Sequence, residues 1–258
     1  MNLLLLEVDE NARLLGPEDR RTRHIMRILG KKTGDFVEAG LISHEPFGPA
    51  PDSLGTARIR RLDGEGLIVD YLPDREAAPL YPLRLILGFP RPIQASRVLK
   101  DLTSLGLAEI ILTGTELGEK SYLESDFWKK GGYERSLVEG AEQAANPRLP
   151  RVLRSWTLAR ALDEIEARDA PRGWGEPDWD SGSLLILDPR TPIPPMGQLE
   201  LTAPVTLAIG SERGWTDSEL RTLSARGFRS VSLGPRILKT ETAALVGSAI
   251  ALARIGRL

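Results

Sequence analysis

Apolar runs and amphipathic stretches alternate from about residue 80 to the end of the chain, and this alternation restricts its fold more than any other feature. Leu83–Phe89 is a mostly apolar run, as expected of a strand covered on both faces. Pro92–Leu105 has apolar residues at helical spacing and ends at Gly106, and Glu109–Thr113 is the next expected strand. A strand–helix–strand order predicts a parallel sheet, so we expect an α/β domain over residues 80–258.

The same alternation continues to the end of the chain. Two further helices are expected at Tyr133–Ala145 and Thr157–Arg168, and three further strands at Leu184–Leu187, Val205–Ile209 and Ser230–Leu233. Between the last two strands, Thr216 and Glu219 have the spacing of a capping box, and Gly227 closes the helix that they begin. We expect Pro171–Ser183 to be a loose surface excursion.

The first seventy residues are predicted to be mostly β-structure with one helix. That helix opens at Gly16–Asp19, carries Ile25, Ile28 and Leu29 inward and stops at Gly30. The expected strands are Leu3–Val8, Phe36–Ile42 and a hairpin of Arg58–Arg60 with Leu67–Leu72. These elements predict a small barrel-like domain over residues 1–74, followed by a proline-containing linker at Pro73–Pro82.

Composition excludes several kinds of chemistry. The chain has no cysteine, which rules out disulfides, thiolate zinc sites, iron–sulfur clusters and a cysteine nucleophile. Only two histidines are present, and 34 basic residues against 36 acidic ones give no general attraction to nucleic acid. The leucines at the start are too few for a membrane span or a signal sequence, so we expect a soluble cytoplasmic protein with no membrane contact.

Three loops that follow expected strands are unusual. They are Leu187–Pro189, Ile209–Trp215 and Leu233–Ala243, and the last two contain glycines that allow close approach of a ligand. Ligands of open parallel sheets bind beyond the carboxyl ends of the strands, so three such loops favour a small-molecule site over three simple turns. The dinucleotide, P-loop and nucleophile-elbow motifs are missing, which argues against an NTPase or a hydrolase.

Basic residues are clustered despite the near-neutral total. Residues 20–32 contain six Lys or Arg and no acid, residues 84–100 contain four more, and Arg148, Arg151 and Arg154 follow. Such clusters can neutralise phosphates, although any one of them can also be a solvated helix face. Together they favour nucleic acid as a partner.

Several motifs resemble one known family. Leu233–Ala243 reads L-G-P-R-I-L-K-T-E-T-A and resembles the L-G-x-R-I-L-[RK]-x-E-T-A signature of SPOUT methyltransferases of the RsmE type. Ile209–Trp215 is similar to that family's I-G-P-E-G-G-[FW] loop, and His24–Leu29 with Gly34-Asp35 to its H-x-x-R-V-L-R…G-D. Glu142-Gln143 with Arg148 and Pro150 resembles its E-Q…R-x-P segment, and Ser104–Leu107 occupies the place of its E-L-G-V.

The resemblance implies a fold and an activity. The fold would be a PUA-like β-barrel RNA-binding domain (residues 1–74) before a SPOUT α/β domain (80–258), whose parallel sheet ends in a trefoil knot near 185–258. The family methylates N3 of a uridine in the decoding region of 16S ribosomal RNA in the small ribosomal subunit. It uses S-adenosyl-L-methionine, releases S-adenosyl-L-homocysteine, needs no metal and acts as a homodimer through the knotted domain.

The resemblance places the cofactor contacts in the three loops, and the chemistry of the expected reaction suggests roles for further residues. The expected cofactor contacts are Leu187, Asp188, Pro189, Ile209, Gly210, Glu212, Gly214, Leu233, Gly234, Ile237, Leu238, Thr240 and Ala243. The expected RNA contacts are Arg23, His24, Arg27, Arg91, Gln143, Arg148 and Arg213. The alternative for His24 is a histidine packed in a core, and that for Gln143 is a hydrogen-bonded polar residue on a helix. Arg236 is expected to stabilise the developing anionic base or a phosphate, the alternative being an ion pair with Glu212 or Glu241. Glu241 is expected to act as a base or as an acidic residue at the start of the last helix.

The chain departs from the family pattern at a few positions, namely Gly30, Arg91, Ser104, Asn146, Ser211 and Arg213. Arg213 replaces a glycine of the second loop and is expected to contact RNA or to crowd the cofactor. Two alternatives therefore stay open. One is a noncatalytic RNA-binding or ribosome-assembly factor on the same fold, and the other is a SPOUT enzyme with a different RNA target.

Overall fold

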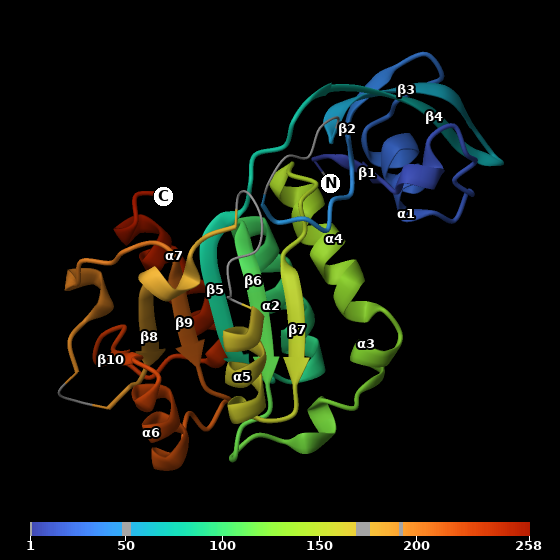
Figure 1. Ribbon diagram of the computed structural model, residues 1–258. Helices are drawn as coiled ribbons and strands as arrows, with labels where there is room; N and C mark the ends of the chain where they lie inside the picture. Colours follow the sequence, from blue (N-terminus) through green and yellow to red (C-terminus); the bar gives the residue numbers. More distant parts are fainter. Residues whose placement is uncertain (1, 48–52, 169–175, 191–192) are drawn as a thin grey trace.

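Two β-sheets organise the chain in the computed structural model, which describes residues 2–47, 53–168, 176–190 and 193–258. The N-terminal sheet has four strands in the order β1-β2-β3-β4, and the C-terminal sheet has six in the order β10-β8-β9-β5-β6-β7. Figure 1 shows the N-terminal sheet beside one end of the larger layered unit, next to helix α4.

The N-terminal sheet is mixed. Strand β1 (Leu4–Leu6) runs parallel to β2 (Phe36–Leu41), which pairs antiparallel with β3 (Leu54–Asp63), and β3 forms a long hairpin with β4 (Gly66–Arg75). The hairpin and the strand at Phe36 confirm the expectations for this region. The pairings do not establish a closed PUA-like barrel, which stays a prediction.

The expected first helix begins as predicted but changes its winding. Asp19 caps α1 (Arg20–Arg23), which continues directly into the π-helix η2 (His24–Ile28). The prediction that Ile28 and Leu29 point inward was wrong, because these side chains are 72% and 45% exposed while Ile25 is fully buried. The wider π turn, closed by the bond from the Leu29 amide to the His24 carbonyl, breaks the spacing that aligns apolar residues on an α-helix.

The C-terminal sheet is entirely parallel, which confirms the α/β prediction. Strand β5 (Tyr81–Gly88) lies at its centre between β9 (Val205–Ile209) and β6 (Leu107–Thr113). The remaining strands are β7 (Arg151–Ser155), β8 (Ser183–Leu187) and β10 (Arg229–Val231), of which β7 had not been predicted.

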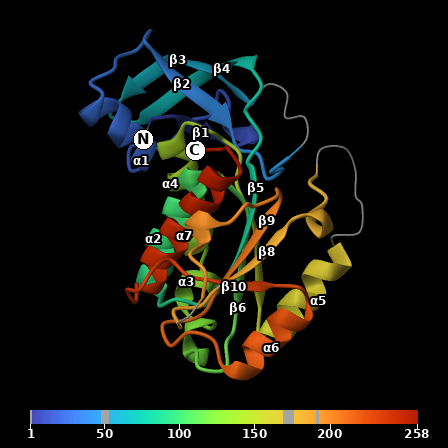
Figure 2. The ribbon, with the colours of Figure 1, turned by 90° about the vertical axis from the view of Figure 1, so that its left-hand side faces the viewer.

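Helices cover both faces of this sheet (Figures 1 and 2). One face packs against α2 (Pro92–Leu105), α4 (Gly132–Ala144) and α7 (Thr240–Arg254), and the other against α5 (Leu158–Arg168) and α6 (Asp217–Ala225). The short α3 (Asp126–Lys129) precedes α4. The predicted capping box of Thr216 and Glu219 is present at the start of α6.

The predicted surface excursion before β8 is only partly described. Residues 171–175 lie outside the described residues, and the prediction was wrong for Trp179, which is 5% exposed. The guanidinium of Arg84 lies 4.0 Å from the centre of the Trp179 ring and donates a hydrogen bond of 2.7 Å to Glu109. This buried cation is therefore part of the sheet's packing and not of an RNA-binding surface.

Candidate functional site

The three unusual loops meet at one edge of the C-terminal sheet and enclose a cavity of about 310 Å³. All the residues that the sequence predicted as cofactor contacts line it, together with three more residues of the same loops. The lining residues are Leu187, Asp188, Pro189, Ile209, Gly210, Ser211, Glu212, Arg213, Gly214, Leu233, Gly234, Arg236, Ile237, Leu238, Thr240 and Ala243.

Sheet topology explains why distant loops converge. Strand β8 pairs with β9 on one side and β10 on the other, all parallel, so their carboxyl ends lie at the same edge. The amide of Asp188 continues the ladder beyond β8 by donating to the Val231 carbonyl at 3.0 Å. The position of the cavity therefore follows from the order of the strands.

The second loop is tightly folded around glycine. The Gly214 amide donates to the Ser211 carbonyl at 2.8 Å, and Gly214 has a φ of +74°, which suits glycine. A Cβ on Gly210 would lie 2.6 Å from the Gly214 carbonyl carbon, and one on Gly88 would lie 2.4 Å from the Ser211 nitrogen. The loop backbone is thus pressed between β5 and the cavity, and a side chain at either glycine would displace it.

Two buried polar groups at the cavity, those of Ser211 and Asp188, differ in their hydrogen bonding. The Ser211 hydroxyl is buried and has no hydrogen-bond partner among the described residues, so it is available to a ligand. The Asp188 carboxylate is also buried but accepts hydrogen bonds from the Arg190 side chain at 2.7 and 2.9 Å. Burial alone raises the pKa of Asp188, but the bonds from Arg190 outweigh it and hold this pKa below its ordinary value.

Helix α7 begins at the cavity. Thr240 and Ala243 line it, and the first backbone bond of this helix closes from Ala243 to Lys239, which leaves the preceding amides of the first turn without a partner inside the helix. The Gly247 position, where a Cβ would be 3.0 Å from Leu187 and Leu207, lets the helix lie close to β8 and β9. The helix N-terminus therefore adds a partial positive charge to the site.

The predicted catalytic residues lie at this helix and in the loop before it. Arg236 lines the cavity, is exposed and makes no ion pair with any described residue, so the alternative of a pair with Glu212 or Glu241 is not observed. Glu241 is half-buried in the first turn of α7. Neither carboxylate neutralises the guanidinium.

The residues predicted to contact RNA do not form one group. Arg91, Arg213 and Arg27 are exposed, whereas Arg23 pairs with Glu18. His24 and Gln143 line a separate polar cavity of about 210 Å³, where the helix at Arg20–Ile28 faces α2 and α4. The His24 Nε2 atom there has no described partner, and burial lowers the pKa of this histidine.

The prediction that Arg148 contacts RNA was wrong. Its side chain is 1% exposed and donates to the Ala77 carbonyl at 3.0 and 3.1 Å and to the Glu45 carbonyl at 3.0 Å. Burial lowers the pKa of Arg148, against the nearby carboxylates of Glu76 and Glu45. This arginine instead connects the segment before β7 to the chain that joins the two sheets.

A larger cavity of about 570 Å³ was missed by sequence reasoning. It lies beyond the ends of β5, β6 and β7 and is lined by Phe89, Gly114, Thr115, Glu116, Gly118, Glu119, Lys120, Leu123, Trp156, Thr157, Leu158, Ala159, Glu219 and Thr222. If Arg151–Ser155 had been predicted as a parallel strand, the loop after it, which contains Trp156, would have been expected at the carboxyl ends of β5 and β6. Within the described parts of the chain, no three metal-ligating side chains gather, and no helix is long and apolar enough to cross a membrane.

Comparison with known proteins identifies the family. Residues 76–252 match the family model described as an RNA methyltransferase domain. The chain is 38% identical to the ribosomal RNA small subunit methyltransferase E of Treponema pallidum, covering 98% of this chain and 91% of that protein. The chain belongs to the ribosomal RNA small subunit methyltransferase E family.

A second relative and a solved structure agree with this family. The chain is 27% identical to the ribosomal RNA small subunit methyltransferase E 1 of Borreliella burgdorferi, over 99% of both proteins. The methyltransferase E of Neisseria gonorrhoeae, solved bound to S-adenosyl methionine, has a TM-score of 0.72 and 21% identity, covering 99% of this chain and 98% of that one. The resemblance noted in the sequence motifs is therefore confirmed, and the fold is that of the methyltransferase E family.

Proposed function

We propose that the chain transfers a methyl group from S-adenosyl-L-methionine to N3 of a uridine in the decoding region of 16S ribosomal RNA. The observation that carries the proposal is the convergence of the three predicted loops on one cavity at the edge of a parallel sheet. Family membership supports ribosomal RNA of the small subunit as the substrate.

The residues at the cavity suit this cofactor. Apolar side chains such as Leu187, Ile209 and Leu233 offer a surface for the adenine, and the unpartnered Ser211 hydroxyl offers a hydrogen bond. The free amides at the start of α7 suit the cofactor's carboxylate. When bound, the sulfonium supplies an already activated methyl group, so the protein's task is orientation and control of one proton.

That proton is on N3 of the uracil ring, and its removal leaves an anionic base. We assign stabilisation of this anion to Arg236, whose guanidinium lines the cavity without a described carboxylate partner. Glu241 either accepts the proton or helps to orient the first turn of α7. Arg213, Arg91 and the basic residues of the N-terminal sheet are assigned to the RNA.

The rest of the assembly follows the family resemblance. Residues 1–74 are proposed as a PUA-like RNA-binding domain and residues 80–258 as a SPOUT domain with a trefoil knot near 185–258. The proposed active form is a homodimer through the knotted domain, working on the ribosome in the cytoplasm.

Two measurements test the proposed reaction. Isothermal titration calorimetry should show binding of S-adenosyl-L-methionine, and its absence at high protein concentration would leave a noncatalytic RNA-binding or assembly factor. Mass spectrometry of 16S ribosomal RNA from a deletion strain should show loss of the methyl group at the decoding-region uridine. Unchanged methylation there would instead point to a different RNA target.

A further inference from the structure

A groove of about 280 Å³ lies in the N-terminal sheet, away from the cofactor cavity. It is bounded by the first residues of β1 and β2 and by the segment that follows the π-helix. Its lining residues are Asn2, Leu3, Leu4, Ile25, Leu29, Lys31, Phe36, Val37, Glu38 and Thr56. We refer to it as the Phe36 groove.

Apolar side chains around this groove are open to solvent. Phe36 is 50% exposed, Leu29 is 45% exposed and Ile28, on the π-helix, is 72% exposed. The π turn is the local cause, because it rotates Ile28 and Leu29 away from the core that buries Ile25. The groove itself therefore presents an aromatic ring and an aliphatic side chain, those of Phe36 and Leu29, to solvent.

One cation without a described ion-pair partner lines the groove, and three more lie near it in the sequence or in the strand register. Lys31 lines it, and Arg58 lies directly opposite Phe36 in the β2–β3 register, so both point to the same face of the sheet. Arg27 and Lys32 flank the π-helix and the groove along the chain and are exposed. None of these four cations forms an ion pair with a residue that the structure describes.

The carboxylates near the groove already have partners. Glu38 accepts a hydrogen bond of 2.8 Å from Arg75, and Asp70, the neighbour of Arg58 across the hairpin, accepts one of 3.1 Å from Arg60. Asp35 accepts the backbone amide of Lys32 at 2.8 Å. The amide does not cancel the charge of Asp35, but the four cations outnumber this one carboxylate, so the charge near the groove is positive even though the whole chain carries −2.

Exposed aromatic surface among unpaired cations is the combination that binds single-stranded RNA. Bases stack on aromatic rings whatever their sequence, and lysine and arginine side chains neutralise the adjoining phosphates. We propose that the Phe36 groove binds a single-stranded segment of the RNA substrate. One base stacks on Phe36, and the phosphates beside it lie against Lys31, Lys32, Arg27 and Arg58.

This inference deepens the proposed function and rests on RNA being the substrate. It also divides the basic run of residues 20–32 into two parts. Arg20 and Arg21 pair with carboxylates distant in the chain and Arg23 pairs with the exposed Glu18, whereas Arg27, Lys31 and Lys32 have no described ion-pair partner and are available to phosphates.

Fluorescence anisotropy with a fluorescein-labelled oligouridine tests the groove. Phe36→Ala should weaken binding about 5- to 150-fold, the range found when an aromatic stacking platform is removed, and Phe36→Leu should weaken it less. The double variant Lys31→Ala/Lys32→Ala should lower the magnitude of the slope of log K against log salt concentration by about 1.4, because each phosphate contact to a single strand contributes about 0.7. Arg13→Ala, which removes an exposed cation paired with Asp9 in the same region, is the matched control and should bind like the wild type.

Calorimetry with S-adenosyl-L-methionine on each variant separates this proposal from the proposed function. Normal cofactor binding with reduced RNA affinity in the Phe36 variants supports the groove. Wild-type RNA affinity in both Phe36 variants overturns the proposal. If these variants also change oligomeric state in analytical ultracentrifugation while RNA affinity stays the same, the groove binds a protein and not RNA. RNA binding that depends on Phe36 in a chain that does not bind the cofactor supports the groove and rejects the methyltransferase.

Discussion

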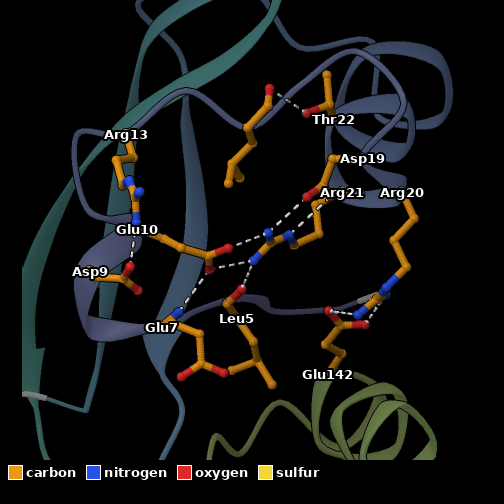
Figure 3. Close-up of polar contacts among 11 residues, drawn as sticks. Leu5, Glu7, Asp9, Glu10, Arg13, Asp19, Arg20, Arg21, Thr22 and Glu142 are labelled. Atoms are coloured by element: carbon orange, nitrogen blue, oxygen red, sulfur yellow. Dashed lines mark hydrogen bonds and ion pairs between the residues drawn. The ribbon is translucent and has the colours of Figure 1, made fainter. Parts of the chain in front are cut away.

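Arg20 and Glu142 join the N-terminal region to the C-terminal unit through a bidentate ion pair (Figure 3). The guanidinium of Arg20 donates hydrogen bonds of 2.6 and 2.7 Å to the two carboxylate oxygens of Glu142, near the end of α4. Beside it, the Asn2 side chain donates to the Gln143 carbonyl at 2.8 Å. The predicted RNA contact Gln143 is thereby held at a constant position relative to the N-terminal sheet.

Replacing Glu142 by glutamine should destabilise this junction. The carboxylate is 3% exposed and Arg20 36%, so loss of the charge leaves a partly hydrated guanidinium with a weaker partner. We expect the free energy of unfolding to fall by about 1 to 2 kcal/mol, measured by urea denaturation. Arg13→Gln, at the exposed Arg13–Asp9 pair, is the control and should change stability by less than about 0.5 kcal/mol. Equal effects of the two variants would contradict the role of this pair.

Arg21 lies at the centre of a second polar network in the same region (Figure 3). The loss of stability on replacing Arg21 should depend on pH. Its guanidinium contacts both oxygens of Glu10 at 2.7 Å, Asp19 at 2.8 Å and the Leu5 carbonyl at 2.8 Å. The hydrogen bonds from Arg21 lower the pKa of Glu10, and at Asp19 they lower the pKa against the opposing effect of burial. Both carboxylates therefore stabilise the folded state in their ionised form.

The direction of the pH effect follows from these lowered pKa values. The stabilisation is fully present above the ordinary values of 4.5 and 3.8 and is lost as the pH falls through the lower folded-state values. Arg21→Gln should cost about 2 to 4 kcal/mol near pH 7, and the difference from the wild type should shrink below about pH 4. Thermal or urea unfolding between pH 3 and 7 measures this, and a constant difference across that range would refute it.

The cofactor cavity could be predicted because its residues depend on local sequence and one general rule. Strand ends, glycines and the motif Leu233–Ala243 are readable along the chain, and parallel strands bring their carboxyl ends together. Arg148 could not be placed this way. It is one of several arginines in a basic stretch, and only packing against the Ala77 and Glu45 carbonyls, far away in sequence, buries it.

The π-helix was unpredictable for a different reason. Ile25, Ile28 and Leu29 have helical spacing, but one additional residue in a turn changes which of them face the core. The edge strand β7 was also missed, because its arginines made it look like an exposed basic segment. One of them, Arg151, instead pairs with the buried Glu109 at 2.8 Å.

Ser211→Ala should separate stability from cofactor binding. The buried hydroxyl has no described partner, so its removal should leave the free energy of unfolding unchanged or slightly higher. If the hydroxyl bonds the cofactor, affinity for S-adenosyl-L-methionine should fall about 2- to 12-fold in calorimetry, the value of one hydrogen bond. A loss of stability together with unchanged affinity would show that the hydroxyl has a structural role instead.

Arg236→Ala should reduce methyl transfer far more than cofactor binding. If its guanidinium stabilises the anionic base, turnover on small-subunit RNA should fall about 100-fold, the usual cost of losing one transition-state donor. The Kd for S-adenosyl-L-methionine should change by less than about twofold, because the interaction forms mainly with the reacting base. Lys239→Ala removes a nearby exposed cation that does not line the cavity and should retain wild-type turnover. Parallel losses of affinity and turnover in Arg236→Ala would place this arginine with the cofactor and not with the base.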